Sequence, residues 1–185
     1  MYFPVLHTPR LDIRHFCSAD GPAVYAYTAM PSVMTYVPEG CLTQAQAQAF
    51  VEENSTDQAR AAAVILNTEN TLIGHILFHP WFAHQTYEIG WVFNPRYYGH
   101  GYATEAARAL LDYGFETLDL HRIIATCQPE NIASYRIMEK LSMRREAHFQ
   151  QCIYRGNGLW WDELFYAILR DEKKEMPHAH YSSAG

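Results

Sequence analysis

The hydrophobic period of the chain changes near Gly101, from that of a strand to that of a helix. Residues 87–93 form an apolar and aromatic run that Asn94-Pro95 ends. After the loop, small and apolar residues recur at helical spacing and would line one face: Ala103, Ala106, Ala107, Leu110, Leu111, Gly114, Phe115 and Leu118. A strand that leads into an amphipathic helix through a glycine-containing loop is typical of α/β domains.

The rest of the chain mixes strand and helix patterns. Strands are predicted over residues 11–14, 61–67, 72–81, 122–127, 145–153 and 160–169, and helices over residues 18–29, 44–60 and 132–141. Ser18 and Thr43 are the expected N-caps of the first two helices, and Pro31 is expected to end the first one. This order predicts one α/β (α+β) domain with a mixed sheet over residues 1–170, followed by a flexible tail over residues 171–185.

Composition argues against several classes of protein. The net charge of −6 argues against a nucleic-acid partner, since nucleic-acid binders usually carry a basic surface. No run approaches the roughly 20 apolar residues of a membrane span, and no signal peptide is evident. The four cysteines lack metal-ligand spacing, and we interpret them as ordinary thiols of a cytoplasmic protein. His178 and His180 could bind a metal, but they lie in the expected tail, so no metal site is predicted.

The loop between the strand and the helix has the features of an anion site. Gly99 and Gly101 can adopt backbone angles closed to other residues, and they leave room for a ligand. The helix that follows begins with free N–H groups at its positive end, which together suit a pyrophosphate. A tight turn that only starts a helix would explain the glycines equally well. The dinucleotide fingerprint fits poorly, because Thr104 stands where its third glycine belongs.

The segment Arg96-Tyr97-Tyr98-Gly99-His100-Gly101 resembles the phosphate loop of the GNAT superfamily of N-acetyltransferases, which reads Gln/Arg-x-x-Gly-x-Gly/Ala. The chain looks most similar to the RimJ/RimL type, the ribosomal-protein N-terminal acetyltransferases, over residues 8–14, 87–91, 99–106 and 131–141. The resemblance covers residues 8–169. It implies a GNAT-like, largely antiparallel seven-stranded sheet flanked by helices, in which two central parallel strands splay apart near Phe93 and Cys127.

The resemblance also implies acetyl-coenzyme A as the cosubstrate. The loop amides would hold its pyrophosphate, backbone groups near Phe93 would pair with the pantetheine arm, and a main-chain N–H there would face the thioester oxygen. Asn131 would hydrogen-bond the same arm. The expected coenzyme-binding residues are therefore Phe93, Tyr98, Gly99, His100, Gly101, Tyr102, Ala103, Thr104 and Asn131.

Glu88 is the candidate general base. It is the only acidic residue between Asn70 and Glu105, and it lies in an otherwise apolar and aromatic strand. A purely structural glutamate would show the same pattern, and Asp162 and Glu163 in the last strand are the alternative carboxylates. Acetyl transfer needs such a base because the attacking amine must lose a proton.

The general acid departs from the common family pattern. Many GNAT enzymes carry a tyrosine seven residues after the asparagine, and Met138 occupies that position here. In the RimJ/RimL type a serine three residues after the asparagine takes this role, which points to Ser134, with Tyr135 as a weaker alternative. Ser142 stands where the family usually has a glycine that closes the helix in a left-handed cap.

Three functions remain open from the sequence. The first is N-acetylation of a protein N-terminus, the second is acetylation of a small-molecule amine (an amino sugar, polyamine or antibiotic), and the third is acyl-coenzyme A binding without turnover. Aromatic residues that could line an acceptor site are Trp81, Phe82, Tyr97, Tyr98, Trp160 and Trp161. A homodimer is plausible by resemblance alone, and no nucleic-acid or membrane partner is expected.

Overall fold

The computed structural model describes residues 5–56 and 58–174. All its strands belong to one sheet of eight, in the order β1-β2-β3-β4-β5-β6-β8-β7. Their bounds are β1 Leu6–His7, β2 Leu11–Arg14, β3 Ala61–Leu66, β4 Thr71–Pro80, β5 Thr86–Phe93, β6 Arg122–Cys127, β7 Arg144–Gly156 and β8 Leu159–Leu169. Every neighbouring pair is antiparallel except β5 and β6, which confirms the mixed, largely antiparallel sheet. The expected count of seven strands is wrong, because the two-residue strand β1 adds an edge beside β2.

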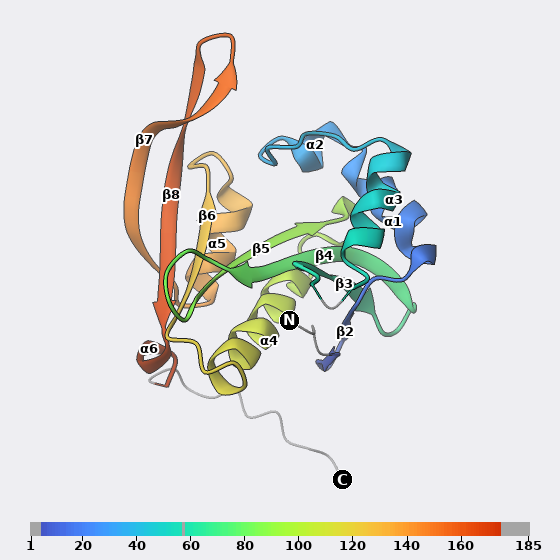
Figure 1. The fold of residues 1–185 in the computed structure, drawn as a ribbon, viewed down its shortest axis with the longest axis horizontal. Helices are drawn as coiled ribbons and strands as arrows, with labels where there is room; N and C mark the ends of the chain where they lie inside the picture. The colour runs from blue at the N-terminus through green and yellow to red at the C-terminus, as the bar shows by residue number, and fades with distance from the viewer. Residues whose placement is uncertain (1–4, 57, 175–185) are drawn as a thin grey trace.

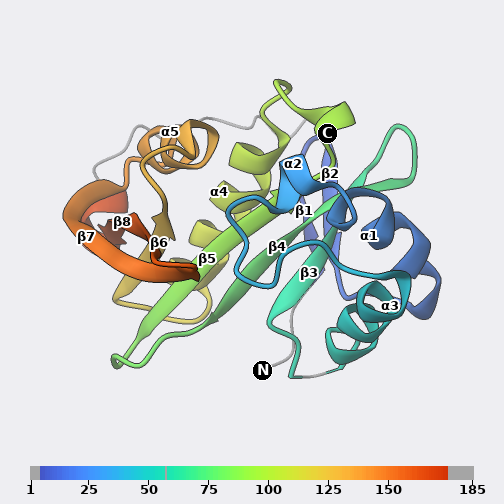
Figure 2. The same ribbon diagram turned by 90° about the horizontal axis from the view of Figure 1, so that it is seen from above.

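Helices cover both faces of this sheet (Figure 1). Their bounds are η1 Ser18–Asp20, α1 Gly21–Thr28, α2 Pro31–Met34, α3 Gln44–Glu53, η2 Pro95–Tyr97, α4 Tyr102–Glu116, α5 Ile132–Lys140 and α6 Arg170–Lys174. In Figure 2, α1 and α3 lie beyond β3, at the opposite end of the molecule from α5 and the β7–β8 hairpin. The α1–α3 region and the α5 region therefore lie on either side of the place where β5 meets β6.

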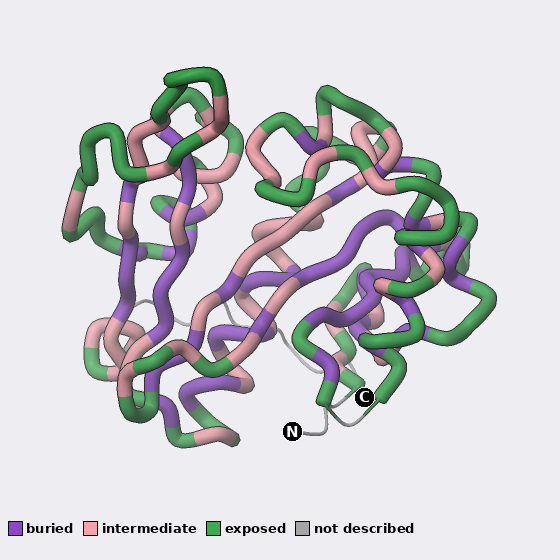
Figure 3. Tube along the Cα trace, turned by 45° about the horizontal axis from the view of Figure 1, so that its top comes forward, coloured by how far each residue is buried: buried purple, intermediate pink, exposed green. Residues whose placement is uncertain are grey.

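Strand β3 shows how the sheet supports a hydrophobic core on each face. Ala62 and Val64 pack into the larger core with α4 and α5, whereas Ala61 and Ala63 pack into the smaller core with α1 and α3. This alternation is the period of two that a strand imposes on its side chains. All six residues of β3 are buried, and Figure 3 shows that burial continues through the central strands while exposed residues gather on the connections and the β7–β8 hairpin.

Helix α4 packs closely against the sheet, as its sequence period predicts. The residues Ala106, Ala107, Leu110, Leu111, Gly114 and Phe115 are all buried. A Cβ atom on Gly114 would lie 2.9 Å from both Ile123 Cδ1 and Phe78 Cζ, so a side chain at this position would push the helix off the sheet. The close approach holds the C-terminal half of α4 against β4 and β6.

The N-terminal helical region differs from the expectation in three places. Ser18 begins a short 3₁₀ segment instead of capping a long helix, because Asp20 accepts hydrogen bonds from the Cys17 N–H and from the Arg14 side chain. Pro31 does follow the end of α1, but it also begins the unpredicted helix α2. Thr43 caps α3 as expected, reciprocally with Gln46.

Helix α3 ends earlier than predicted, at Glu53 instead of near residue 60. The reason is Asn54, whose side-chain oxygen accepts hydrogen bonds from the N–H groups of Arg60 and Ala61, each at 2.9 Å. These bonds turn the chain out of the helix and into β3. A local side-chain acceptor of this kind competes with continued helix formation.

The segment predicted as a C-terminal tail begins within a short helix. Residues 171–174 belong to α6. Lys173 forms ion pairs with Asp112 and Glu116 of α4, and Arg170 Nε donates to the Leu120 carbonyl. The remainder of the expected tail, with His178 and His180, lies outside the described residues. Within residues 5–56 and 58–174, no helix combines the length and apolar character that a membrane span needs.

Candidate active site

The two parallel strands separate halfway along their length. Strands β5 and β6 are in register only at Thr86↔Arg122, Tyr87↔Ile123 and Glu88↔Ile124. Beyond these pairs, β5 continues beside β4 as far as Phe93, and β6 continues beside β8 as far as Cys127. The strands therefore open like a V, which Figure 1 shows as the divergence of β5 from β6. This confirms the splayed pair that the family resemblance implies.

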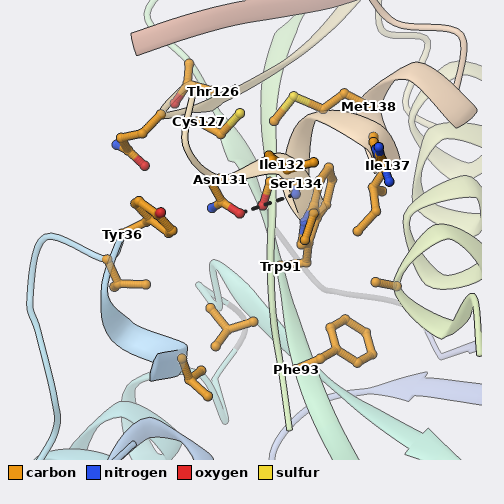
Figure 4. A pocket seen from close by; sticks show the side chains of 18 of the residues that line it. Tyr36, Trp91, Phe93, Thr126, Cys127, Asn131, Ile132, Ser134, Ile137 and Met138 are labelled. Carbon is orange, nitrogen blue, oxygen red and sulfur yellow. Dashed lines mark hydrogen bonds between the residues drawn. The ribbon is translucent and has the colours of Figure 1, made fainter. Parts of the chain in front are cut away.

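A cleft of about 890 Å³ occupies the opening. Its walls come from β5, from the loop and helix start at 97–104, from β6 and the start of α5, and from the α2 region. Figure 4 shows Phe93 on one wall, Asn131 and Ser134 at the start of α5, and Tyr36 on a third side. The cleft thus joins the glycine loop to the candidate catalytic groups in one continuous space.

The glycine loop has the backbone geometry that an anion site requires. Gly99 and Gly101 both have φ of +81°, a left-handed conformation that favours glycine. Gly101 is the N-cap of α4 and has no side chain to bond the first turn, so the N–H groups of residues 102–104 lack acceptors within the helix. Their partial positive charge adds to the helix dipole at this end. A diphosphate fits such donors without any lysine or arginine.

The loop residues differ in whether they line the cleft and in whether their main-chain N–H is already hydrogen-bonded. The N–H of Tyr98 donates to the Pro95 carbonyl at 3.1 Å, so its backbone donor is used inside the loop, although Tyr98 lines the cleft. Gly99, Gly101, Tyr102, Ala103 and Thr104 also line the cleft. The His100 side chain instead stacks on Tyr102, with ring centroids 5.6 Å apart.

Two carboxylates line the closed end of the V, where β5 and β6 separate. Glu88 and Glu163 both line the cleft, one from β5 and one from β8. Burial raises the pKa of Glu163 and the charge of Glu88 adds to this, while a hydrogen bond from the Thr126 side chain partly opposes it. The other alternative carboxylate, Asp162, points to the opposite face of β8, where it accepts bonds from His148 Nε2 at 2.7 Å and the Gln151 N–H at 2.8 Å. The structure therefore brings Glu163, but not Asp162, to Glu88.

Helix α5 carries the remaining candidates. The Asn131 side chain accepts a hydrogen bond from the Ser134 N–H at 3.3 Å, which caps the helix and orients both residues (Figure 4). Ser134 lines the cleft, and Met138, which stands in the tyrosine position, also reaches it while being only 1% exposed. Tyr135 packs against the main core and is not part of the cleft wall.

Sequence reasoning missed two parts of this site. The segment around α2 contributes Tyr36, whose ring lies 5.6 Å from that of Trp161 on β8, so residues far apart in the chain meet beside the cleft. Cys127, named only as a strand end, also lines the cleft, and burial raises the pKa of its thiol to about 12. An alternating strand pattern could have shown that Cys127 faces inward, but no local signal links Tyr36 to Trp161.

The aromatic residues proposed for an acceptor site divide into two groups. Tyr97 and Tyr98 line the cleft, and Trp161 contacts Tyr36 at its edge. Trp81 and Phe82 stack on each other outside the cleft wall, and Trp160 packs on Tyr154 in the β7–β8 hairpin. Within the part of the chain that the structure describes, no group of three or more His, Cys, Asp or Glu residues could hold a metal ion.

Comparison with known proteins identifies the family. Residues 10–144 match the model of the acetyltransferase (GNAT) domain. The chain is 58% identical to the uncharacterized N-acetyltransferase YnaD of Bacillus subtilis over 89% of this chain and 96% of that protein. It superposes on the crystal structure of a GNAT-family acetyltransferase from Bacillus anthracis with a TM-score of 0.85 and 53% identity, over 93% of this chain and all of that one.

A more distant structure shares the fold. The spermidine N-acetyltransferase of Vibrio cholerae, solved in complex with CoA and spermine, superposes with a TM-score of 0.77 at 22% identity, over 90% of this chain and 99% of that one. The matching family model, the close relatives and the splayed strands all agree. The chain belongs to the GNAT family of acetyltransferases, acyltransferase enzymes whose acetyl donor is acetyl-coenzyme A.

Proposed function

We propose that this acetyltransferase transfers the acetyl group to a primary amine that binds between the splayed ends of β5 and β6. The observation that carries the proposal is the continuity of the cleft, which joins the left-handed glycine loop to Glu88 and Glu163. A donor held by its diphosphate at the loop would extend its thioester towards the closed end of the V. The amine would then meet the thioester next to the two carboxylates.

The loop and β5 suit the expected coenzyme contacts. A Cβ at Gly99 would meet no atom of residues 5–56 and 58–174 within 4 Å, which leaves open space beside the loop for a diphosphate. Beyond Glu88, the edge of β5 that faces β6 has no strand partner among the described residues, which leaves main-chain groups as far as Phe93 for the amides of the pantetheine arm. The Asn131 side chain, held by its capping bond, is the proposed contact on the other wall.

Glu88 is the proposed general base. As the amine nitrogen forms its bond to the thioester carbon, Glu88 accepts the proton that the amine loses, directly or through one water. The carbon–sulfur bond then breaks and the electron pair leaves on sulfur. Glu163 shares the site, and its raised pKa makes it the second carboxyl able to exchange protons there.

Ser134 is the proposed donor to the departing sulfur. It lines the cleft from the first turn of α5, where the Asn131 cap fixes its backbone. Met138 cannot take this role because a thioether has no proton to give. The Cys127 thiol also lines the cleft, but with a pKa of about 12 it is protonated near neutral pH and is a poor nucleophile. We therefore propose direct transfer to the amine without an acetyl-cysteine step.

The acceptor is proposed to be a slender cationic amine. Amines arrive protonated near neutral pH, and the paired carboxylates would attract that charge. The ammonium must first lose one proton, to solvent or to Glu163, because only the neutral amine has the lone pair that attacks the thioester; Glu88 takes the second proton during the attack. Tyr36 lines the cleft and its ring lies 5.6 Å from that of Trp161. We propose that this ring pair restricts the acceptor's entry, which would favour a small molecule over a polypeptide N-terminus. Acetylation of a protein N-terminus, and with it the RimJ/RimL type, is the second candidate and requires these two rings to separate.

A panel of amines tests these alternatives. Release of free coenzyme A would be measured with acetyl-coenzyme A and polyamines, amino sugars, aminoglycosides or peptides with free N-termini. We expect turnover with a small cationic amine and little with peptides, and Tyr36→Ala should improve the peptides most. Turnover with peptides alone would favour the N-terminal acetyltransferase instead. Tight binding of acetyl-coenzyme A without transfer to any acceptor would favour the third function, a non-catalytic acyl-coenzyme A-binding protein.

The cellular setting is also proposed. The four cysteines are free thiols, and Cys17, Cys41 and Cys152 are exposed, which suits a reducing compartment such as the cytoplasm. A homodimer stays a prediction from the resemblance. The mass of the protein measured by light scattering tests it, since a dimer would have twice the 21.3 kDa of one chain.

A further inference from the structure

Arg10 joins the N-terminal segment to the glycine loop. It lies in the turn before β2, and its NH1 group donates to the His100 carbonyl at 3.0 Å. Its Nε and NH2 groups bond Glu105 Oε2, each at 2.6 Å, and its own backbone N–H donates to Glu105 Oε1 at 3.0 Å. The guanidinium also lies over the Tyr102 ring, 4.6 Å from the centroid. One side chain thus contacts the loop and the first turn of α4 together.

The bond to His100 fixes a peptide plane between the two glycines. Peptide bonds of the described residues are trans, so the His100 carbonyl and the Gly101 N–H point in opposite directions. Gly101 lines the cleft, whereas Arg10 and His100 are not part of its wall. By holding the carbonyl on the outer side, Arg10 turns the Gly101 N–H towards the cleft. Without that bond, this peptide could rotate more easily, because Gly101 on one side of it tolerates a wide range of φ.

The contact with Arg10 neutralises the negative charge that Glu105 brings to the N-terminus of α4. A carboxylate in the first turn of α4 competes with a bound anion for the positive end of the helix. Glu105 is held by four donors, the Thr8 hydroxyl at 2.7 Å and three groups of Arg10, and its side chain is only 12% exposed. Its charge is therefore neutralised on the side of the loop that faces away from the cleft.

We propose that Arg10 is a positioning residue for the diphosphate site. It orients the main-chain donors of the loop and cancels the charge of Glu105, without touching the coenzyme itself. This inference rests on the proposed role of the loop. The proposal gives the N-terminal segment a role in the site. Arg10 and Glu105 are 95 positions apart in the chain, so no local sequence pattern predicts their contact.

The test compares Arg10→Met with Arg144→Met. Arg144 is a matched control because its side chain is 43% exposed against 44% for Arg10, and it too is paired with a glutamate, Glu146. Isothermal titration with coenzyme A should show an affinity loss of about tenfold or more in Arg10→Met, since charge-assisted hydrogen bonds orient the binding donors. Arg144→Met should bind coenzyme A as the wild type does.

A second readout separates positioning from a general structural role. S-acetyl-pantetheine carries the thioester and the arm but no diphosphate. Arg10→Met should raise the KM for acetyl-coenzyme A with kcat within about twofold, and should leave kcat/KM for S-acetyl-pantetheine unchanged. Equal losses with both donors, or an unchanged affinity for coenzyme A, would overturn the proposal. Wild-type protein that neither binds coenzyme A nor transfers acetyl would instead reject the proposed function.

Arg10→Lys covers the case in which the methionine variant fails to fold. Lysine keeps the charge opposite Glu105 but lacks the planar fork needed to reach both Glu105 and the His100 carbonyl. Its affinity for coenzyme A should fall between those of the wild type and Arg10→Met, or below the wild type if only this variant folds. An affinity equal to that of the wild type would contradict the orienting role of the bond to His100.

Discussion

Glu88 of β5 and Ile124 of β6 are the last two residues that the parallel strands hold in register. Beyond this pair each strand keeps its outer neighbour and loses its inner one, so the cleft starts where Glu88 stands. The main-chain groups needed to bind an extended ligand and the carboxylate needed to accept a proton therefore arise from the same break in the sheet. This relationship is the structural reason for proposing Glu88 as the general base.

Replacement of Glu88 by glutamine should lower kcat by about a hundredfold or more, because general base catalysis typically contributes that much. Steady-state kinetics at saturating acetyl-coenzyme A would measure this loss. Glu53→Gln, at an exposed position at the end of α3, is the control and should behave as the wild type. An unchanged rate in the Glu88 variant would remove this residue from the mechanism.

The difference in stability between Glu163→Gln and the wild type should depend on pH in a defined direction. Burial raises the pKa of Glu163, so ionising it costs the folded state more than the unfolded chain. This cost is absent below the ordinary value of 4.5 and is complete above the raised pKa. Glu163→Gln should therefore have a higher Tm than the wild type near pH 8, and the difference should vanish near pH 4. A difference of the opposite sign at neutral pH would show that the carboxylate is stabilising.

Alanine at Gly99 should weaken coenzyme A binding beyond its effect on stability. Gly99 has φ of +81° and Gly158, in the β7–β8 turn, has φ of +76°, and an added Cβ meets no atom within 4 Å at either position. Both variants should lose roughly 1 kcal/mol of stability from the left-handed backbone. Only Gly99→Ala should bind coenzyme A less tightly in a titration. Equal affinities for the two variants would argue against the loop as the diphosphate site.

Ser134→Ala should lower kcat and leave the KM for acetyl-coenzyme A nearly unchanged, because the hydroxyl would act only as sulfur departs. The loss should lie within about tenfold to a hundredfold, the usual range for one hydrogen-bond donor to developing charge. Full turnover in this variant would mean that the thiolate leaves unaided. Cofactor binding should persist, since the Asn131 cap uses the backbone N–H of Ser134.

Glycine at position 142 should stabilise the protein. Ser142 follows α5 with φ of +58°, the left-handed cap that the family resemblance assigns to a glycine. The neighbouring N–H of Met143 closes the motif by donating to the Met138 carbonyl at 3.0 Å. Ser142→Gly should gain roughly 1 kcal/mol, or about 2–4 °C in Tm. Calorimetry would measure this shift, and a decrease would show that the serine hydroxyl compensates for the backbone strain.

Local patterns were enough to predict the centre of this fold. The strand ending at Phe93, the glycine loop and α4 were predicted because period, turn residues and capping all agree within some 30 residues. Thr43 and its capping box fixed the start of α3 in the same way. The end of α3 was missed because Asn54 uses a side-chain bond to residues six and seven positions ahead, which propensity does not register.

Long-range contacts of the site could not be predicted. Two such contacts are the ring pair of Tyr36 and Trp161 and the ion pair of Arg10 and Glu105. Each joins segments that no sequence periodicity relates. Helix α2 was missed because Pro31 was interpreted only as a helix end, although proline also suits a first helical position. Glu88 could be singled out from the sequence, but its closeness to Glu163 depends on β8 lying next to β6, which the order of strands along the chain does not reveal.

A crystal structure of the protein with acetyl-coenzyme A would test the central claim most directly. The account predicts the diphosphate on the N–H groups of residues 99–104, the arm between β5 and β6 beyond Glu88, and the thioester within reach of Glu88 and Ser134. A coenzyme bound elsewhere, or a complex in which β5 and β6 pair along their whole length with the glycine loop covered, would contradict it.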